Sequence, residues 1–210
     1  MPGTAKEAHL SFADKCLRWF CYGVVHLVHR PKVYGPKPEI DGPCIFACRH
    51  VGLMDPVILM VEYLPWMLRP LVAKDYYEKS DFTKSFYRHA QCIPLDRKKV
   101  STLWVEESLE ALGKGENIII FPEGKRNKSG KGLLPFQNGA ALLSYKTGAK
   151  IVPVWNEYWD FPHRYRMSIG EPFNLDPVPE EGPTSEWLNL QSAKIQAAVA
   201  ALEQNCHSER

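Results

Sequence analysis

Residues 117–126 read NIIIFPEGKR, and this segment is the clearest indication of the fold. The four apolar residues after Asn117 form the clearest candidate for a buried strand in the chain, because the run is short and rich in β-branched side chains. A proline, a glutamate, a glycine and two cations follow directly. Ligands bind just beyond the carboxyl ends of strands in open α/β sheets, so the segment predicts both a central strand and a binding loop.

Other short apolar runs predict further strands, at residues 44–48 (CIFAC), 71–73, 92–95 and 151–155. Helical spacing predicts helices from Pro56 to a stop at Pro65, and over residues 101–112, 136–147 and 185–206. Ser101 is the expected cap of the second helix, while Gly113 and Gly148 are expected stop signals. Strands that alternate with helices indicate an α/β fold, with a central, largely parallel mixed sheet flanked by helices.

Residues 9–30 predict an amphipathic helix, because apolar side chains recur there at spacings of three and four. Asp14, Lys15 and Arg18 mark a narrow polar face. Two interpretations remain open. In the first, the helix packs on the core. In the second, it lies in a membrane interface, with two aromatic residues at headgroup depth and three cations near anionic lipid: Trp19, Tyr22, Arg30, Lys32 and Lys37.

Composition excludes several classes of protein. The chain has 210 residues, of which 45% are hydrophobic, enough for one substantial core without disulfides. Its net charge of +2 does not indicate a nucleic-acid binder. Six irregularly spaced cysteines, without a secretory leader before them, predict reduced thiols and a protein that faces the cytosol. No run approaches the roughly 20 apolar residues of a membrane-spanning helix, so we expect a soluble or surface-bound protein.

His50 and Asp55 are a candidate catalytic pair, in the segment RHVGLMDP. On a regular helix, side chains five positions apart would point about 140° away from each other. Gly52 permits a turn that would let them meet, and a carboxylate bonded to one imidazole nitrogen leaves the other free as a general base. The alternative is that Asp55 only caps a helix that starts at Pro56, beside an ordinary histidine.

Two basic clusters also follow strand candidates. One contains Arg97, in LDR, and the other contains Arg126, in FPEGKR. The planar guanidinium of arginine suits a phosphate, since it can donate to two oxygens at once. Neighbouring lysines add positive potential: Lys98, Lys99, Lys125, Lys128 and Lys131. Each cluster taken alone is equally consistent with a solvated basic turn.

Taken in order, four motifs resemble those of the glycerolipid acyltransferases typified by 1-acylglycerol-3-phosphate acyltransferase. They are His50-x4-Asp55, Leu95-Asp96-Arg97, Phe121-Pro122-Glu123-Gly124-x-Arg126 and Val152-Pro153-Val154. The resemblance covers about residues 39–155. It implies an acyltransferase domain over residues 39–210, preceded by an amphipathic, membrane-interface segment over residues 1–38.

The resemblance also implies roles for individual residues. His50 would deprotonate the acceptor hydroxyl, and Asp55 would orient the histidine. Arg97 and Arg126 would bind the acceptor's phosphate, while Glu123 and Gly124 would shape its pocket. Lys74, in LVAKDYY, resembles a basic residue often found between the first two motifs.

Two departures from the family pattern concern the acceptor. Asn127 stands where the family usually has serine or threonine after the third-motif arginine. In addition, Gln137 follows Phe136 where the family often has a lysine. Loss of a cation there leaves the acceptor headgroup open.

The expected reaction needs an acyl thioester, either acyl-CoA or acyl carrier protein, as co-substrate and no cofactor. A zinc site built from Cys44, Cys48, His50, His89 and Cys92 is disfavoured, because the first two cysteines belong to a strand interior. We therefore expect no metal. The expected partners are a lyso-lipid and the cytoplasmic face of a membrane, bound peripherally or monotopically. Thioester hydrolysis and non-catalytic lipid binding remain alternatives.

Overall fold

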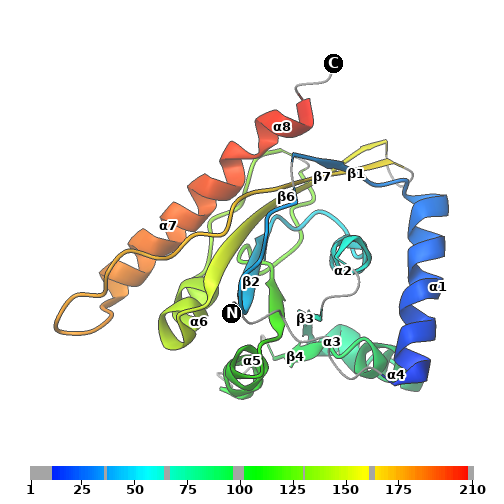
Figure 1. The fold of residues 1–210 in the computed structure, drawn as a ribbon, viewed down its shortest axis with the longest axis horizontal. Helices are drawn as coiled ribbons and strands as arrows, with labels where there is room; N and C mark the ends of the chain where they lie inside the picture. The colour runs from blue at the N-terminus through cyan, green and yellow to red at the C-terminus, as the bar shows by residue number, and fades with distance from the viewer. Residues whose placement is uncertain are drawn as a thin grey trace.

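The computed structural model describes residues 11–35, 37–63, 67–96, 102–129, 131–160 and 164–207. Within these residues seven strands form one sheet in the order β1-β7-β6-β2-β5-β3-β4 (Figure 1). The strands are β1 (Lys32–Tyr34), β2 (Cys44–Cys48), β3 (Leu68–Ala73), β4 (Ile93–Leu95), β5 (Asn117–Ile120), β6 (Lys150–Asp160) and β7 (Arg164–Ile169).

The sheet is largely parallel and mixed, as predicted. Strands β4, β3, β5, β2 and β6 pair in parallel, so their carboxyl ends share one edge of the sheet. Only β6 and β7 pair antiparallel, and β1 is parallel to β7. The clearest strand of the sequence, β5, lies between β2 and β3, where both of its edges are paired.

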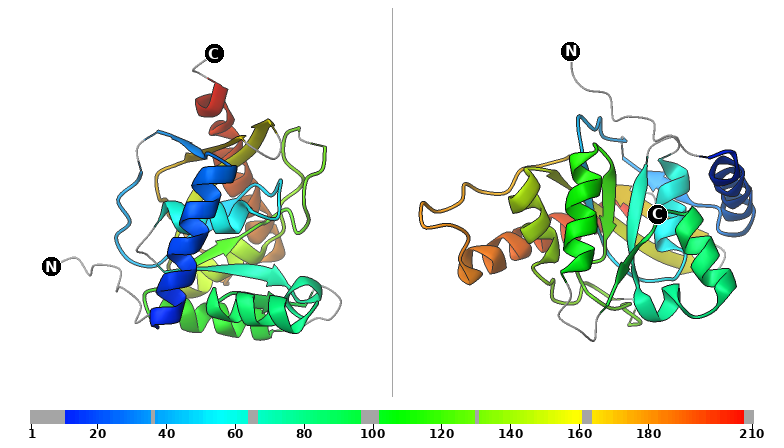
Figure 2. Two further views of the ribbon diagram at one scale, coloured as in Figure 1. Left: turned by 90° about the vertical axis from the view of Figure 1, so that its right-hand side faces the viewer. Right: turned by 90° about the horizontal axis from the view of Figure 1, so that it is seen from below.

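Helices cover both faces of this sheet. The helices of the described residues are α1 (Phe12–Val28), α2 (Asp55–Glu62), α3 (Lys74–Tyr77), α4 (Asp81–His89), α5 (Leu103–Gly113), α6 (Gly139–Thr147), α7 (Ser185–Ala201) and α8 (Glu203–His207). Side chains of β2 alternate between two cores. Phe46 packs in the core shared with α2, whereas Ile45 and Ala47 pack in the core shared with α5, α6 and α7. The outer helix α1 packs on α2 and α4, away from the sheet (Figures 1 and 2).

Several predicted boundaries are wrong. The carboxyl-terminal helix is divided into α7 and α8, and α6 begins at Gly139 rather than residue 136. Gly113 is the last residue of α5, and Gly115, with φ +82°, makes the turn that follows. The predicted cap Ser101 lies outside the described residues, and Thr102 occupies the N-cap position without a side-chain cap bond. Gly148 ends α6 in the left-handed conformation, as predicted.

The largest difference concerns the ribbon of β6 and β7. The predicted strand over residues 151–155 continues to Asp160 and returns as β7, which the apolar pattern did not predict. Cys48, the last residue of β2, pairs with Val154, so β6 extends beyond the edge where β2 ends. The ribbon therefore continues past the site-bearing edge of the sheet.

Helix α1 turns two charged side chains inward, together with the apolar Val25. Ser11 and Asp14 form a capping box at its start. Asp14 and Arg18 are buried, and they contact His89 on α4 (3.0 Å) and the sulfur of Met67 (2.8 Å), respectively. Of the three residues of the predicted polar face, Asp14 and Arg18 are therefore buried, whereas Lys15 is exposed. No helix in the described part of the chain has both the length and the hydropathy needed to cross a membrane.

Candidate active site

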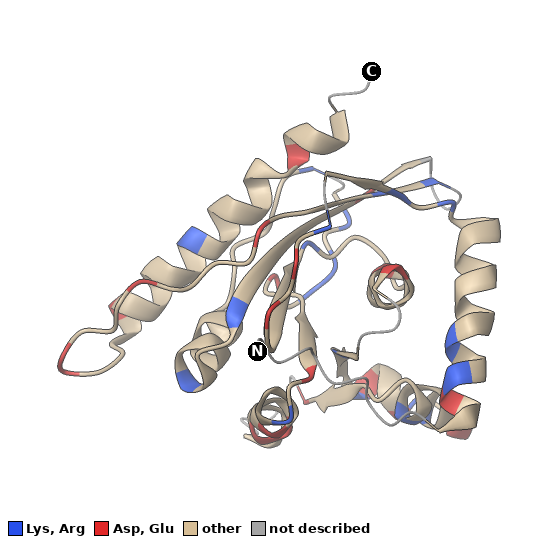
Figure 3. Cartoon of the chain, in the orientation of Figure 1, with Lys and Arg blue, Asp and Glu red and all other residues tan. Residues whose placement is uncertain are grey.

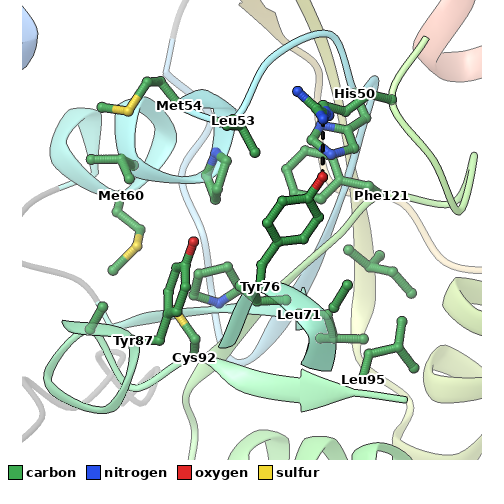
Figure 4. Close-up of a pocket in the computed structure, with 18 of the residues that line it drawn as sticks. His50, Leu53, Met54, Met60, Leu71, Tyr76, Tyr87, Cys92, Leu95 and Phe121 are labelled. Atoms are coloured by element: carbon green, nitrogen blue, oxygen red, sulfur yellow. Dashed lines mark hydrogen bonds between the residues drawn. The ribbon is translucent and has the colours of Figure 1, made fainter. Parts of the chain in front are cut away.

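The site lies at the carboxyl ends of β2 and β5. His50 follows β2 and Phe121 follows β5, and their rings stack with centroids 4.2 Å apart (Figure 4). The two strands are adjacent and parallel, with Ala47 paired to Ile120, and this register brings the rings together. The two motifs, each of which the sequence placed after a strand candidate, thus meet at one edge of the sheet.

His50 and Asp55 meet as the sequence predicted. Nδ1 of His50 lies 2.9 Å from Oδ2 of Asp55, whose side chain is fully buried. The same oxygen accepts hydrogen bonds from the backbone N–H groups of Val51 (2.7 Å) and Gly52 (2.8 Å), which hold the intervening loop around the carboxylate. Met54 is the N-cap of α2, and Asp55 is its first residue. The alternative that Asp55 caps the helix is therefore wrong.

Gly52 is required by lack of space. A Cβ at this position would lie 2.7 Å from Cε2 of Tyr158 and 3.2 Å from Oδ1 of Asp55. Only a residue without a side chain lets the loop pass between the ribbon and the carboxylate. The turn was predicted correctly, but its reason is close packing against Tyr158.

The pair opens onto a cavity of about 870 Å³. His50 lines one end, together with the basic loop after β5, which contributes Lys125, Arg126 and Lys128. The rest of the wall is mainly apolar and comes from α1, α2, β3, α4 and the segment between α4 and β4, with Val24, Met60, Val72, Phe86 and Cys92 among its residues. In Figure 4, His50 and Phe121 lie opposite Met60, Tyr87 and Cys92. Because Nδ1 is held by Asp55, Nε2 is the nitrogen left for a substrate.

Arg126 and Gly124 both line the cavity, as the resemblance implied. A guanidinium nitrogen of Arg126 donates to the hydroxyl of Tyr76 on α3, at 3.1 Å (Figure 4). Gly124 has φ +68°, a conformation that favours glycine and turns the loop back toward β5. The loop thus presents a cation beside the base.

Glu123 holds the backbone of the site together. Its carboxylate is buried, and its two oxygens accept hydrogen bonds from the backbone N–H groups of His50 (2.8 Å) and Leu134 (2.9 Å). The described residues that line the cavity do not include it. Asn127 acts in a similar way, since its backbone N–H donates to the carbonyl of His50 at 2.7 Å. Glu123 therefore shapes the pocket only indirectly, by bracing His50.

One described residue suggested by the resemblance, Lys74, is not brought into the site. Lys74 begins α3 and is exposed, with Nζ 3.9 Å from a carboxylate oxygen of Glu78. It is absent from the described residues that line the cavity. Arg97 lies outside the described residues.

The strand patterns did not predict a role for two tyrosines of the ribbon. Tyr165 on β7 donates its hydroxyl to Oδ1 of Asp55 at 3.0 Å, and its cross-strand partner Tyr158 on β6 packs on Gly52. Burial and the charge of Asp55 raise the pKa of Tyr165 well above its usual value, so the hydroxyl stays protonated. The alternation of polar and apolar residues in RYRMSI was the available signal for β7.

The two thiols among the described residues that line the cavity, Cys21 and Cys92, are poor nucleophiles, because burial raises the pKa of both. Burial raises the pKa of Cys92 to about 12, and the thiolate is the reactive form of cysteine. Burial and then the charge of Asp55 also raise the pKa of Cys48. His50 is therefore the best candidate base of the cavity, without a thiolate partner.

Several known proteins resemble this chain in sequence. The sequence model of the family described as acyltransferase matches residues 28–157. The chain is 27% identical over 123 residues to the 1-acyl-sn-glycerol-3-phosphate acyltransferase of Bacillus subtilis, which covers 58% of the chain and 60% of that protein. It is 28% identical over 176 residues to the human 1-acyl-sn-glycerol-3-phosphate acyltransferase alpha, which covers 76% of the chain and 61% of that protein. The chain thus spans about 60% of the length of these relatives.

One solved structure shares the fold. The crystal structure of the 1-acyl-sn-glycerophosphate acyltransferase PlsC from Thermotoga maritima superposes with a TM-score of 0.63 at 20% sequence identity. The match covers 90% of this chain and 79% of that one.

Proposed function

Because the chain belongs to the acyltransferase family, we propose that it transfers a fatty acyl group from a thioester to the free hydroxyl of 1-acyl-sn-glycerol-3-phosphate, giving phosphatidic acid. The names of the relatives support this acceptor. The observation that carries the proposal is the His50–Asp55 pair at the basic end of a large, mainly apolar cavity. Such a site suits a lipid with an anionic headgroup.

The proposed chemistry needs one base. Nε2 of His50 takes the proton of the acceptor hydroxyl while its oxygen attacks the thioester carbonyl, and Asp55 stabilises the imidazolium that forms. The tetrahedral intermediate then collapses, the carbon–sulfur bond breaks, and the thiolate leaves and takes the proton from His50. A thioester is already activated, so transfer proceeds without an acyl-enzyme. The protonated thiol of Cys92 is consistent with this direct route.

The acyl chains are assigned to the apolar part of the cavity. Its walls from α1, α2 and α4 offer dispersion contacts and exclude water from hydrocarbon. The thioester donor is acyl-CoA or acyl carrier protein, and the reaction requires no cofactor. Placing hydrocarbon against these helices leaves the headgroup and the hydroxyl at the end where His50 and Arg126 lie.

Arg126 is assigned to the phosphate of the acceptor. It is half-buried, it lines the cavity, and the hydroxyl of Tyr76 fixes one side of its guanidinium. The remaining N–H donors suit phosphate oxygens. The family resemblance adds Arg97 as a second phosphate ligand.

Replacing Arg126 by alanine should raise the KM for 1-acyl-sn-glycerol-3-phosphate by roughly tenfold to a hundredfold, because one charged hydrogen-bond partner is lost. Steady-state kinetics with varied acceptor measure this. Arg126→Lys keeps the charge and should recover part of the loss. Arg88→Ala, which removes an exposed arginine from α4, is the matched control and should leave the KM unchanged. An Arg126→Ala enzyme with the wild-type KM would remove Arg126 from the acceptor site.

We assign α1 to the membrane surface. Its buried side contains Asp14 and Arg18, whereas Trp19 and Leu27 are 67% and 75% exposed. From Trp19 to Val28 the helix has no lysine, arginine, aspartate or glutamate (Figure 3). A helix with its apolar face outward is unfavourable in water and favourable at the boundary between headgroups and acyl chains. This position would also bring the cavity wall formed by α1 next to the lipid that supplies the acceptor.

The double substitution Trp19→Glu and Leu27→Glu should weaken binding to phosphatidylglycerol-containing vesicles by at least tenfold, because two apolar side chains that would be buried in the membrane become charged. Vesicle co-sedimentation measures the change. Leu190→Glu on α7, where leucine is 62% exposed, is the matched control. Equal binding by the double variant and the wild type would contradict an interfacial α1.

A panel of acceptors tests the proposed function. Release of free thiol from acyl-CoA is followed with lyso-lipids that share one acyl chain and differ in headgroup. We expect the highest kcat/KM with the phosphate monoester. Preference for a choline or glycerol headgroup would keep the acyl transfer and overturn the proposed acceptor. Release that is independent of every lyso-lipid would indicate hydrolysis instead.

A further inference from the structure

The buried Asp55 is held by an unusual set of donors. Oδ2 receives three hydrogen bonds, from His50 Nδ1 and from the backbone of Val51 and Gly52. All three donors are within five residues of Asp55 in the chain. Oδ1 receives a bond from Tyr165, which is 110 positions away. The bond from Tyr165 therefore ties the carboxylate to β7 of the β6–β7 ribbon.

Tyr165 is fixed on several sides. Its side chain is fully buried, and its ring packs edge to face on that of Tyr158, its direct cross-strand partner, with centroids 4.9 Å apart. Its backbone N–H donates to the carbonyl of His29, just after α1. The phenol therefore has little freedom to turn away from Asp55. A buried donor held in this way can fix both the position and the charge of its acceptor.

We propose that Tyr165 is a positioning residue of the catalytic pair, so that the working unit is Tyr165–Asp55–His50. Its hydroxyl holds Asp55 in the orientation that bonds Nδ1 of His50 and disperses part of the carboxylate's negative charge. The inference rests on the proposed role of His50 as general base. With Tyr165 the site includes a residue of β7, which lies outside residues 28–157, the range that the family model matches.

The effect on the reaction follows from the geometry. When His50 takes a proton, the imidazolium is stabilised by Asp55, and the carboxylate must stay aligned to do so. Without the phenol, Oδ1 would lie buried without this donor, and the carboxylate could rotate away from Nδ1. The remaining negative charge would also be more concentrated and would hold the proton on His50 more strongly.

The first test is Tyr165→Phe, which removes only the hydroxyl. We expect kcat to fall about tenfold, the loss of one buried hydrogen bond, with both KM values nearly unchanged. The rising limb of kcat against pH, which follows loss of the proton from His50, should move to higher pH. Tyr63→Phe is the matched control, because Tyr63 is also buried but packs on Phe46 instead of contacting Asp55. It should leave kcat and the pH profile unchanged.

Other ionisable groups surround the pair on every side. They are Cys48 and Arg49 at the end of β2, Glu123, Lys125 and Arg126 after β5, and Tyr158 on β6. Tyr165→Phe leaves all of them in place. A shift of the pH profile in this variant, absent from Tyr63→Phe, therefore reports on the phenol of Tyr165.

Two further measurements keep the test decisive if Tyr165→Phe does not fold. Site-specific 3-fluorotyrosine at position 165 preserves the shape and makes the phenol a stronger donor, so the rising limb should move to lower pH. In the Asp55→Asn background, the effect of changing Tyr165 should largely disappear, because the two residues act as one unit. If the effects of the Tyr165 and Asp55 changes on kcat multiplied, as they do for independent residues, the proposal would be overturned. An unshifted pH profile in the fluorotyrosine protein would overturn it as well.

These outcomes differ from failure of the proposed function. If folded His50→Ala still transfers acyl groups, the general-base role fails and the role of Tyr165 fails with it. If His50→Ala is inactive while Tyr165→Phe behaves like Tyr63→Phe, only the role of Tyr165 fails.

Discussion

His50→Ala should lower kcat for acyl transfer by about a thousandfold, because it removes the general base that deprotonates the acceptor hydroxyl. The fold should survive. The backbone N–H and carbonyl of residue 50, which bond Glu123 and Asn127, are retained in the variant. Steady-state assays of thiol release, with the thermal unfolding midpoint measured on the same preparation, check both expectations.

The control for this variant is His207→Ala. His207 is on α8, where it pairs with Glu157, and it does not line the cavity. Its loss should leave kcat unchanged. Substantial turnover by a folded His50→Ala protein would show that another group removes the proton.

Glu123→Ala should destabilise the protein by about 2–4 kcal/mol, since the backbone N–H groups of His50 and Leu134 would each lose a buried acceptor. Activity should fall together with stability, because the loop that carries His50 loses one of its hydrogen bonds to the loop after β5 and keeps the one from Asn127. Urea denaturation followed by circular dichroism measures the free energy of unfolding.

Glu123→Gln distinguishes a structural role of Glu123, which accepts hydrogen bonds from backbone N–H groups, from a role in substrate binding. Glutamine keeps one acceptor oxygen, so about half of the lost stability should return. Glu78→Ala, on the exposed residue after α3, is the control and should leave stability nearly unchanged. If Glu123→Ala had wild-type stability and only a raised KM for the acceptor, Glu123 would belong to the substrate pocket itself.

The local part of the site could be predicted because its determinants are close in sequence. His50 and Asp55 are five residues apart, and the glycine between them indicated the turn that joins them. The close packing of Tyr158 against Gly52, which leaves no space for a side chain at position 52, could not be predicted. That contact depends on how far β6 extends. The convergence of His50 with Phe121 followed from the general rule that parallel strands share a carboxyl edge.

Contacts between residues far apart in the sequence could not be predicted and are known only from the structure. Tyr165 reaches Asp55 from β7, a short strand in which charged and polar residues alternate with apolar ones, so β7 lacks the continuous apolar run that indicated the other strands. The same limit applies to α1. Its spacing predicted an amphipathic helix, but periodicity cannot tell which face meets the protein. In the structure the inward side of α1 carries Asp14 and Arg18 as well as Val25, while Trp19 and Leu27 are exposed.

The most direct test of the account is the stoichiometry of the wild-type reaction. Purified protein is mixed with acyl-CoA, with and without 1-acyl-sn-glycerol-3-phosphate, and free thiol and phosphatidic acid are both quantified. Direct acyl transfer to the lyso-lipid should give negligible thiol release without the acceptor and one phosphatidic acid for each thiol released with it. Thiol release at the same rate in both mixtures, without phosphatidic acid, would contradict it.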